Sequence, residues 1–215
     1  MQKLIPKIYA MDELERQYLI GLYNNRVSLL GETPAALGWS PTGQRTRYGR
    51  AVEFFGREAL EGASLADYGC GIGDFYGFLA GEGIHAKYAG FDINPGLLEI
   101  ARRRHPDASF GILDIDESGL PGVFDFSLIC GVFNQRMEDA ASAAKRCIEK
   151  MWARTAKALV FDALSEDAAG RDISLHYWSP QALFDFALTL PDCHRAVFEA
   201  LDREVLVLCL ERHPR

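Results

Sequence analysis

Residues 65–188 alternate between short apolar runs and longer amphipathic runs, and this alternation constrains the fold more than any other feature of the chain. The apolar runs LADY (65–68), KYAGFDI (87–93), ASFGILDI (108–115), FDFSLICGVF (124–133) and KALVFDAL (157–164) predict strands. The runs at 74–83, 94–106, 138–155 and 179–188 predict helices. Strands that alternate with crossover helices run parallel, so we expect a parallel sheet that is covered by helices on both faces.

Two strand-like runs near the C-terminus break this alternation. CHRAVFEA (193–200) and EVLVLCLER (204–212) are joined by a link too short for a crossover helix, so they must pair antiparallel. The second run is apolar on both faces, which is typical of a strand with neighbours on each side. The sequence therefore predicts an α/β, doubly wound, Rossmann-like sheet of seven strands. The sheet is mostly parallel and ends in an antiparallel hairpin whose last strand is inserted inside its predecessor.

The N-terminal region before the first predicted strand has no strand pattern. Residues 11–31 and 44–60 predict two helices, and residues 32–43 predict a loop between them. We expect one compact domain, with a helical cap at 1–62 and a Rossmann-like core at 63–215. The cap either covers one edge of the sheet, with its arginines solvated, or forms a lid over a ligand.

Composition excludes several classes of protein. The net charge of −7 disfavours nucleic acid as a partner, because nucleic-acid-binding domains usually present basic patches. The five cysteines include no C-x-x-C pair, and the histidines show no ligand spacing, so we expect neither a disulfide framework nor a metal site. No apolar run reaches the roughly 20 residues that span a bilayer, so we expect a cytoplasmic protein without a membrane partner. Its oligomeric state is open.

A glycine-rich turn follows the first predicted strand. Gly69, Gly71 and Gly73 occupy alternate positions, and Asp67 precedes them. Such a turn brings backbone N–H groups and a helix N-terminus to the carboxyl edge of the sheet, where doubly wound folds bind ligands. The spacing differs from the dinucleotide pattern G-x-G-x-x-G, and the lysine of a phosphate-binding loop is absent. The turn therefore predicts a ligand site, but not a phosphate site.

Three further segments reach the same edge. Asp92 ends the second predicted strand, where a carboxylate can accept both hydroxyls of a ribose. Asp114 and Ile115 close the third, where an acid and an apolar side chain could hold an adenine amino group and ring face. The fourth strand delivers Cys130 to this edge.

In this order and spacing, the segments resemble the class I S-adenosylmethionine-dependent methyltransferases. LADYGCGIGD is similar to the family's D/E-x-G-x-G-x-G motif, YAGFDINPGLLEIARRR to its ribose-binding acid and helix, and GILDIDES to its adenine loop. With FDFSLICGVF and the closing hairpin, the resemblance covers residues 64–210. LLGETPAALGWSPTGQRTRYGRAVEFF, VFNQRM and HYWSP also resemble a group of small bacterial methyltransferases whose substrates are mostly unassigned.

The resemblance implies an enzyme that transfers a methyl group by in-line displacement from S-adenosyl-L-methionine to a small-molecule acceptor, leaving S-adenosyl-L-homocysteine. It implies that the cofactor's methionine part lies by the glycine turn, its ribose on Asp92, and its adenine between Ile93 and the Asp114–Ile115 loop. We hypothesise that Arg47 pairs with the cofactor's carboxylate. The expected cofactor-binding residues are Asp67, Gly69, Cys70, Gly71, Gly73, Asp92, Ile93, Asp114, Ile115, Cys130 and Arg47.

Candidates for the acceptor side are weaker. His176, just after the fifth strand, is either a base or a residue that hydrogen-bonds a loop. Asn134 follows the fourth strand, where the family holds its acceptor, and a structural amide is the alternative. The expected acceptor pocket comprises Tyr23, Trp39, Phe133, Tyr177 and Trp178, although burial in the core would explain the last two equally well.

Two other functions are open at this point. The chain could methylate protein or RNA, or it could bind S-adenosylmethionine or S-adenosylhomocysteine without catalysis. The sequence CGVFNQRM lacks the N/D-P-P-Y signature of amino-methylating nucleic-acid enzymes, which weighs against modification of adenine N6. The acceptor atom and the need for a general base are not determined.

Overall fold

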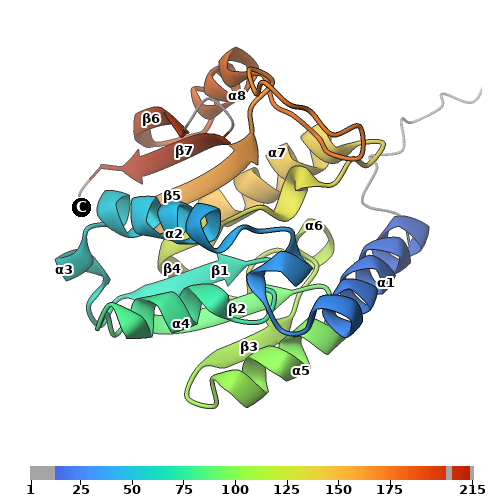
Figure 1. Ribbon diagram of the computed structural model, residues 1–215. Coiled ribbons are helices and arrows are strands. Elements are labelled where there is room, and N and C mark those ends of the chain that lie inside the picture. The colour runs from blue at the N-terminus through green and yellow to red at the C-terminus, as the bar shows by residue number, and fades with distance from the viewer. Residues whose placement is uncertain (1–12, 202–204, 214–215) are drawn as a thin grey trace, which may run out of the picture.

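The computed structural model describes residues 13–201 and 205–213, and in these residues seven strands form one sheet in the order β3-β2-β1-β4-β5-β7-β6 (Figure 1). The strands are β1 Ser64–Tyr68, β2 Lys87–Asp92, β3 Ser109–Ile112, β4 Phe124–Ile129, β5 Thr155–Leu164, β6 Cys193–Leu201 and β7 Val205–Arg212. The first five strands pair parallel, and β7 pairs antiparallel with both β5 and β6. The predicted sheet and the inserted last strand are thus confirmed.

Helices cover both faces of the sheet. They are α1 Glu13–Leu30, α2 Pro41–Phe55, α3 Arg57–Leu60, α4 Asp74–Gly81, α5 Pro95–Arg104, α6 Ile115–Ser118, α7 Ala140–Trp152 and α8 Pro180–Ala187, with 3-10 turns η1 Pro34–Leu37 and η2 Val132–Asn134. The helix predicted at 11–31 is α1, and its first two residues lie outside the described residues. None of the helices in the described ranges is long and apolar enough to cross a membrane.

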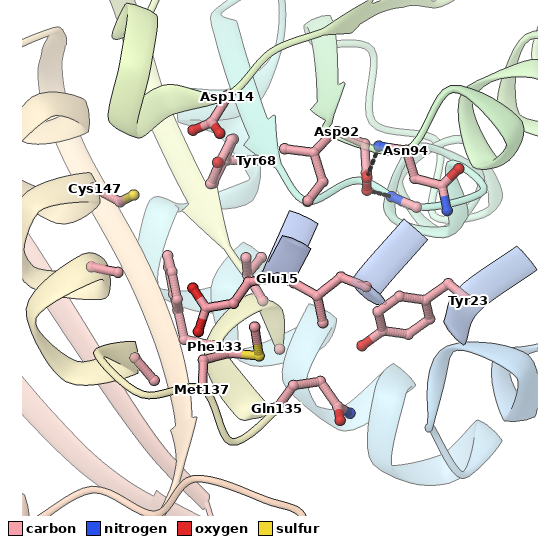
Figure 2. A pocket seen from close by; sticks show the side chains of 18 of the residues that line it. Glu15, Tyr23, Tyr68, Asp92, Asn94, Asp114, Phe133, Gln135, Met137 and Cys147 are labelled. Atoms are coloured by element: carbon pink, nitrogen blue, oxygen red, sulfur yellow. Dashed lines mark hydrogen bonds between the residues drawn. The ribbon is translucent and has the colours of Figure 1, made fainter. Parts of the chain in front are cut away.

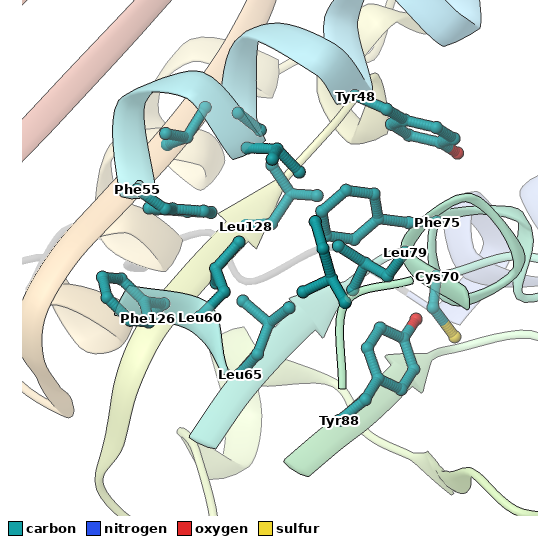
Figure 3. Close-up of a cluster of buried hydrophobic side chains, with 14 of the residues drawn as sticks. Tyr48, Phe55, Leu60, Leu65, Cys70, Phe75, Leu79, Tyr88, Phe126 and Leu128 are labelled. Carbon is teal, nitrogen blue, oxygen red and sulfur yellow. The ribbon is translucent and has the colours of Figure 1, made fainter. Parts of the chain in front are cut away.

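Alternate strand residues build two separate cores, because successive side chains of a strand point to opposite faces. Leu65 and Leu128 pack under α2 and α4, in the cluster shown in Figure 3. Their neighbours Ala66 and Ile129 pack on the other face with α7 and α8. Helix α2 contributes Tyr48, Ala51, Val52 and Phe55 to the first core, so this part of the N-terminal region is a layer of the fold itself.

Several predicted boundaries are wrong. The helix predicted at 44–60 begins at Pro41, after the N-cap Ser40, and breaks at Gly56, whose φ is 84°. The third strand ends at Ile112, because Asp114 caps the short helix α6 with its own side chain. The fourth strand ends at Ile129, because Gly131, with φ 72°, turns the chain into η2.

Candidate functional site

A cavity of about 330 Å³ lies at the carboxyl ends of β1, β2 and β4, under α1 (Figure 2). Its lining comes from the turn after β1, the end of β2, the segments after β3 and β4, and one face of α1. The parallel strands converge at this edge, which is where open α/β sheets bind ligands.

The glycine turn presents bare backbone to the cavity. Gly69 and Gly71 line it and have positive φ angles of 76° and 55°. A Cβ atom on Gly69 would lie 2.2 Å from Cγ2 of Val132, and one on Gly71 would lie 2.9 Å from Cδ1 of Leu37. Side chains at these two positions would therefore meet neighbouring atoms in the cavity wall. Gly73 lies beside the ring of His105, outside the lining, at the N-cap of α4.

Asp92 is the buried carboxylate of the cavity. Its Oδ2 accepts the N–H of Gly71 at 2.9 Å, and its Oδ1 accepts the N–H of Asn94 at 2.9 Å (Figure 2). Burial raises the pKa of Asp92, while the hydrogen bonds from Asn94 and Gly71 act in the opposite direction. A carboxylate offers about four lone-pair sites, so Asp92 can accept further hydrogen bonds from a ligand.

Two residues of the motif lie behind the turn rather than in the cavity wall. The Tyr88 hydroxyl donates to Oδ2 of Asp67 at 2.6 Å, and burial raises the pKa of Asp67 to about 7. Cys70 is buried in the core on the α2 side, and burial raises the pKa of its thiol well above the ordinary value. A thiol of raised pKa carries little thiolate, so Cys70 is a poor nucleophile.

Arg47 pairs with a buried acid of the protein itself. Its Nη1 lies 3.1 Å from Oδ2 of Asp162, which is 2 % exposed, and its guanidinium stacks over Trp39 at 4.3 Å from the ring centroid. Asp162 also accepts the N–H of Gly131 at 2.5 Å and the thiol of Cys130 at 3.2 Å. Trp39, Cys130 and Gly131 line the cavity, whereas Arg47 stands behind them.

An ion pair connects the segment after β3 to α1. Asp114 lines the cavity, and its Oδ2 accepts Nη2 of Arg16 at 2.7 Å. Ile115 is fully buried in the core, and its N–H donates to the Tyr68 hydroxyl at 3.2 Å. Ile93 and Phe133 lie in the lining.

The residues expected around the acceptor fall into two groups. Tyr23 and Trp39 line the cavity. Asn134, His176, Tyr177 and Trp178 lie outside its lining, and the N–H of His176 donates to the carbonyl of Asn134 at 2.9 Å. Burial and the nearby Arg136 lower the pKa of His176. Catalytic roles for Asn134 and His176 stay predictions.

The structure adds residues that sequence reasoning missed. On α1, Glu15 and Leu19 join Tyr23 in the lining, and after β4 the segment with Gln135, Met137 and Glu138 does so. The positions on α1 are four residues apart, which places them on one helix face and could have pointed to them. Within the described ranges, no group of three or more His, Cys, Asp or Glu side chains could hold a metal ion.

Comparisons with known proteins agree with this geometry. Residues 65–153 match the family described as "Methyltransferase domain". No curated protein sequence matches the chain. The fold is similar to magnesium protoporphyrin IX methyltransferase from Synechocystis PCC 6803, solved with S-adenosylhomocysteine, at a TM-score of 0.68 and 13% identity over 93% of this chain and 98% of that one.

Two further solved structures show the same likeness of fold. The N-methyltransferase NodS from Bradyrhizobium japonicum WM9 aligns at a TM-score of 0.66 and 19% identity, over 90% of this chain and 99% of that one. A TehB-like methyltransferase from Corynebacterium glutamicum aligns at 0.58 and 19%, over 94% of this chain and 100% of that one. The matched domain, which contains the glycine turn and Asp92, and the sheet with its inserted last strand support a class I S-adenosylmethionine-dependent methyltransferase.

Proposed function

We propose that the protein binds S-adenosyl-L-methionine in the cavity at the carboxyl edge of the sheet and transfers its methyl group to a small-molecule acceptor. The observation that carries this proposal is one cavity in which the bare backbone of Gly69 and Gly71, the carboxylate of Asp92 and a covering helix meet. Its volume, about 330 Å³, falls in the range of small-molecule sites. Neighbours of the same fold were solved with S-adenosylhomocysteine, which supports the choice of cofactor.

Each part of the site has a proposed task. The glycine turn offers room and backbone to the methionine part of the cofactor, and Asp92 accepts the ribose hydroxyls with its remaining lone pairs. Ile93 and the segment at Asp114 border the adenine. S-adenosylmethionine supplies a methyl group that its sulfonium has already activated, so the protein mainly aligns the reactants and excludes water.

Titration calorimetry with S-adenosylmethionine and S-adenosylhomocysteine tests this proposal. Asp92→Asn should weaken the affinity for S-adenosylhomocysteine by about tenfold or more, because a hydrogen bond to a charged group contributes about 1.5–3 kcal/mol. Asp107→Asn, an exposed aspartate outside the cavity, is the matched control and should bind as the wild type does. The absence of binding by the wild type would overturn the proposal.

A second experiment identifies the class of acceptor. Methyl-labelled cofactor is incubated with a small-molecule extract, with total RNA and with total protein. Label in the small-molecule fraction supports the proposed function, and label in RNA or protein replaces it with a macromolecular acceptor. Binding of the cofactor without label in any fraction would favour a non-catalytic binding protein.

A further inference from the structure

The cavity has two opposite walls of different chemistry, as Figure 2 shows. Tyr68, Asp92 and Asp114 lie on the wall made by the strand ends. Phe133, Gln135 and Met137 lie on the facing wall, made by the segment after β4, with Glu15 and Tyr23 of α1 between them. If the cofactor occupies the strand ends, as proposed above, the second wall faces the acceptor.

All charged side chains in the described part of the lining are acidic. Six of the described lining residues are acids, Glu15, Asp92, Asp114, Asp116, Glu138 and Asp139, and none is a lysine, arginine or histidine. Cations behind the lining pair with some of them: Arg16 with Asp114, and Arg146 with Asp116 and Asp139. Glu138, an exposed lining residue of the segment after β4, has no ion pair among the described residues.

Like the acids, the aromatic side chains of the cavity favour a positively charged ligand. Tyr23 and Phe133 line the cavity, and the π faces of such rings attract cations. Trp39 also lines it, but the guanidinium of Arg47 already stacks over its ring. Met137, Leu19 and Ile20 add apolar surface beside them. Aromatic rings and carboxylates, with no basic side chain among the described lining residues, suit a ligand with a cationic head on an apolar body.

We infer that the acceptor is an amine with an apolar body, which enters as an ammonium ion at the Glu138 side of the cavity and is methylated on nitrogen. The inference rests on the proposed function. Before transfer, the ammonium gives one proton to water. The freed nitrogen lone pair then forms the new N–CH3 bond as the CH3–S bond breaks, sulfur keeps the bonding pair as a neutral thioether, and nitrogen becomes the cation.

The acids of the lining favour an amine over a carboxylate or phenolate as acceptor, because the two kinds of acceptor differ in their charge during methyl transfer. With an amine, positive charge passes from sulfur to nitrogen, and carboxylates on the acceptor side stabilise that charge as it develops. A carboxylate or phenolate acceptor would have to lose its hydration shell beside fixed negative charges, and the described lining residues include no cationic side chain to replace it.

Matched probes test the inference through binding alone. The protein is first saturated with S-adenosylhomocysteine, and 2-phenylethylamine, 2-phenylethanol and 3-phenylpropanoate, which share one apolar body, are then titrated calorimetrically. We expect the amine to bind most tightly and the carboxylate least tightly. An amine that binds no more tightly than the alcohol overturns the inference, while failure of S-adenosylhomocysteine itself to bind overturns the proposed function.

The labelled product of the small-molecule extract gives an independent readout. An N-methyl product stays on a cation exchanger at pH 7 and keeps its label in mild alkali. Label that alkali releases as methanol, or that passes the exchanger unretained, shows an ester or an ether and contradicts the inference.

A variant without the Glu138 carboxylate tests whether this residue binds the ammonium ion. Glu138→Gln should weaken binding of 2-phenylethylamine by up to about fivefold, as expected for a partly exposed charge pair, and leave the affinity for S-adenosylhomocysteine unchanged. Glu149→Gln removes the same charge from an exposed position on α7 outside the cavity and is the control. Equal amine affinity in the two variants contradicts the role of Glu138.

Discussion

Gly131 lies where the N-terminal region contacts the turn after β4 in the cavity wall. Its φ of 72° lies in the left-handed region, its N–H donates to Asp162, and a Cβ atom there would lie 2.3 Å from Cζ2 of Trp39. Trp39 is held in turn by the guanidinium of Arg47. The turn after β4 therefore admits no side chain unless Trp39 leaves its place in the cavity wall.

We expect Gly131→Ala to lower the free energy of unfolding by about 2–4 kcal/mol, since it combines backbone strain with overpacking. Urea unfolding measures this loss. Gly62→Ala is the control, because Gly62 has a φ of 70° but nothing within 4 Å of its Cβ position, so strain alone should cost about 1–2 kcal/mol. Equal losses in both variants would show that contact with Trp39 contributes nothing.

The buried Asp67 makes stability depend on pH. Its pKa is about 7 in the folded protein, against an ordinary value of 3.8, because burial disfavours the charged form. Between these values the folded protein keeps a proton that the unfolded chain has lost, so stability falls as pH rises through this window and levels off above about pH 7.

Asp67→Asn should remove this dependence, because the amide does not titrate and its oxygen can still accept from Tyr88. From pH 5 to pH 8 the wild type should lose about 2–3 kcal/mol of stability relative to the variant. Denaturant unfolding without cofactor at both pH values measures the difference. Parallel pH profiles would contradict the raised pKa.

At the scale of elements, α1 covers the cavity without being part of either core. None of its residues is buried. Arg16 binds Asp114 and Glu117 at one point, and Asn94 donates to Asn24 and to the carbonyl of Ile20 at another. Because Asn94 also donates to Asp92, the covering helix is linked by hydrogen bonds to the proposed ribose site.

Arg16→Ala should loosen α1 and leave the rest of the fold intact. We expect faster hydrogen exchange of the α1 amides, with a change of about 1 kcal/mol or less in the global free energy of unfolding. Arg50→Ala is the control, since its ion pairs with Glu53 and Glu199 do not involve α1. Unchanged exchange of α1 in Arg16→Ala would show that other contacts hold the helix.

In the molecule as a whole, residues 205–212 form an interior strand of the sheet. Strand β7 lies between β5 and β6, and Leu208 is fully buried opposite Phe161. Folding therefore cannot finish before residues 205–212 are in place, although the proposed site is built from residues 15–147.

Leu208→Ala should cost about 2–5 kcal/mol, as truncation of a core leucine does. Val197→Ala, on the edge strand β6 and only partly buried, should cost about 1 kcal/mol or less. Urea unfolding compares the two variants. Similar losses would contradict the interior place of β7 between β5 and β6.

The mostly parallel pairing and the inserted last strand follow from the sequence. Apolar runs of the right length alternate with helices, and the link before β7 is too short for a crossover. The glycine turn and Asp92 were also recognisable, because positive φ and a strand-end acid depend on local residue types. The ends of β3 and β4 were harder to predict. The chain leaves β3 because Asp114 caps a short helix, and it leaves β4 because Gly131 makes a left-handed turn.

Several side chains that face the cavity could not be predicted from the sequence and are known only from the folded chain. The motif alone does not show that Asp67 turns away toward Tyr88 or that Arg47 is taken by Asp162, because both partners are distant in the chain. Glu15 and Tyr23 of α1 also line the cavity because of distant contacts: Arg16 and Asn24 hydrogen-bond this helix to Asp114 and Asn94. Local pattern determines strands and turns, since these depend on neighbouring residues, whereas the cavity wall depends on contacts between segments that only folding brings together.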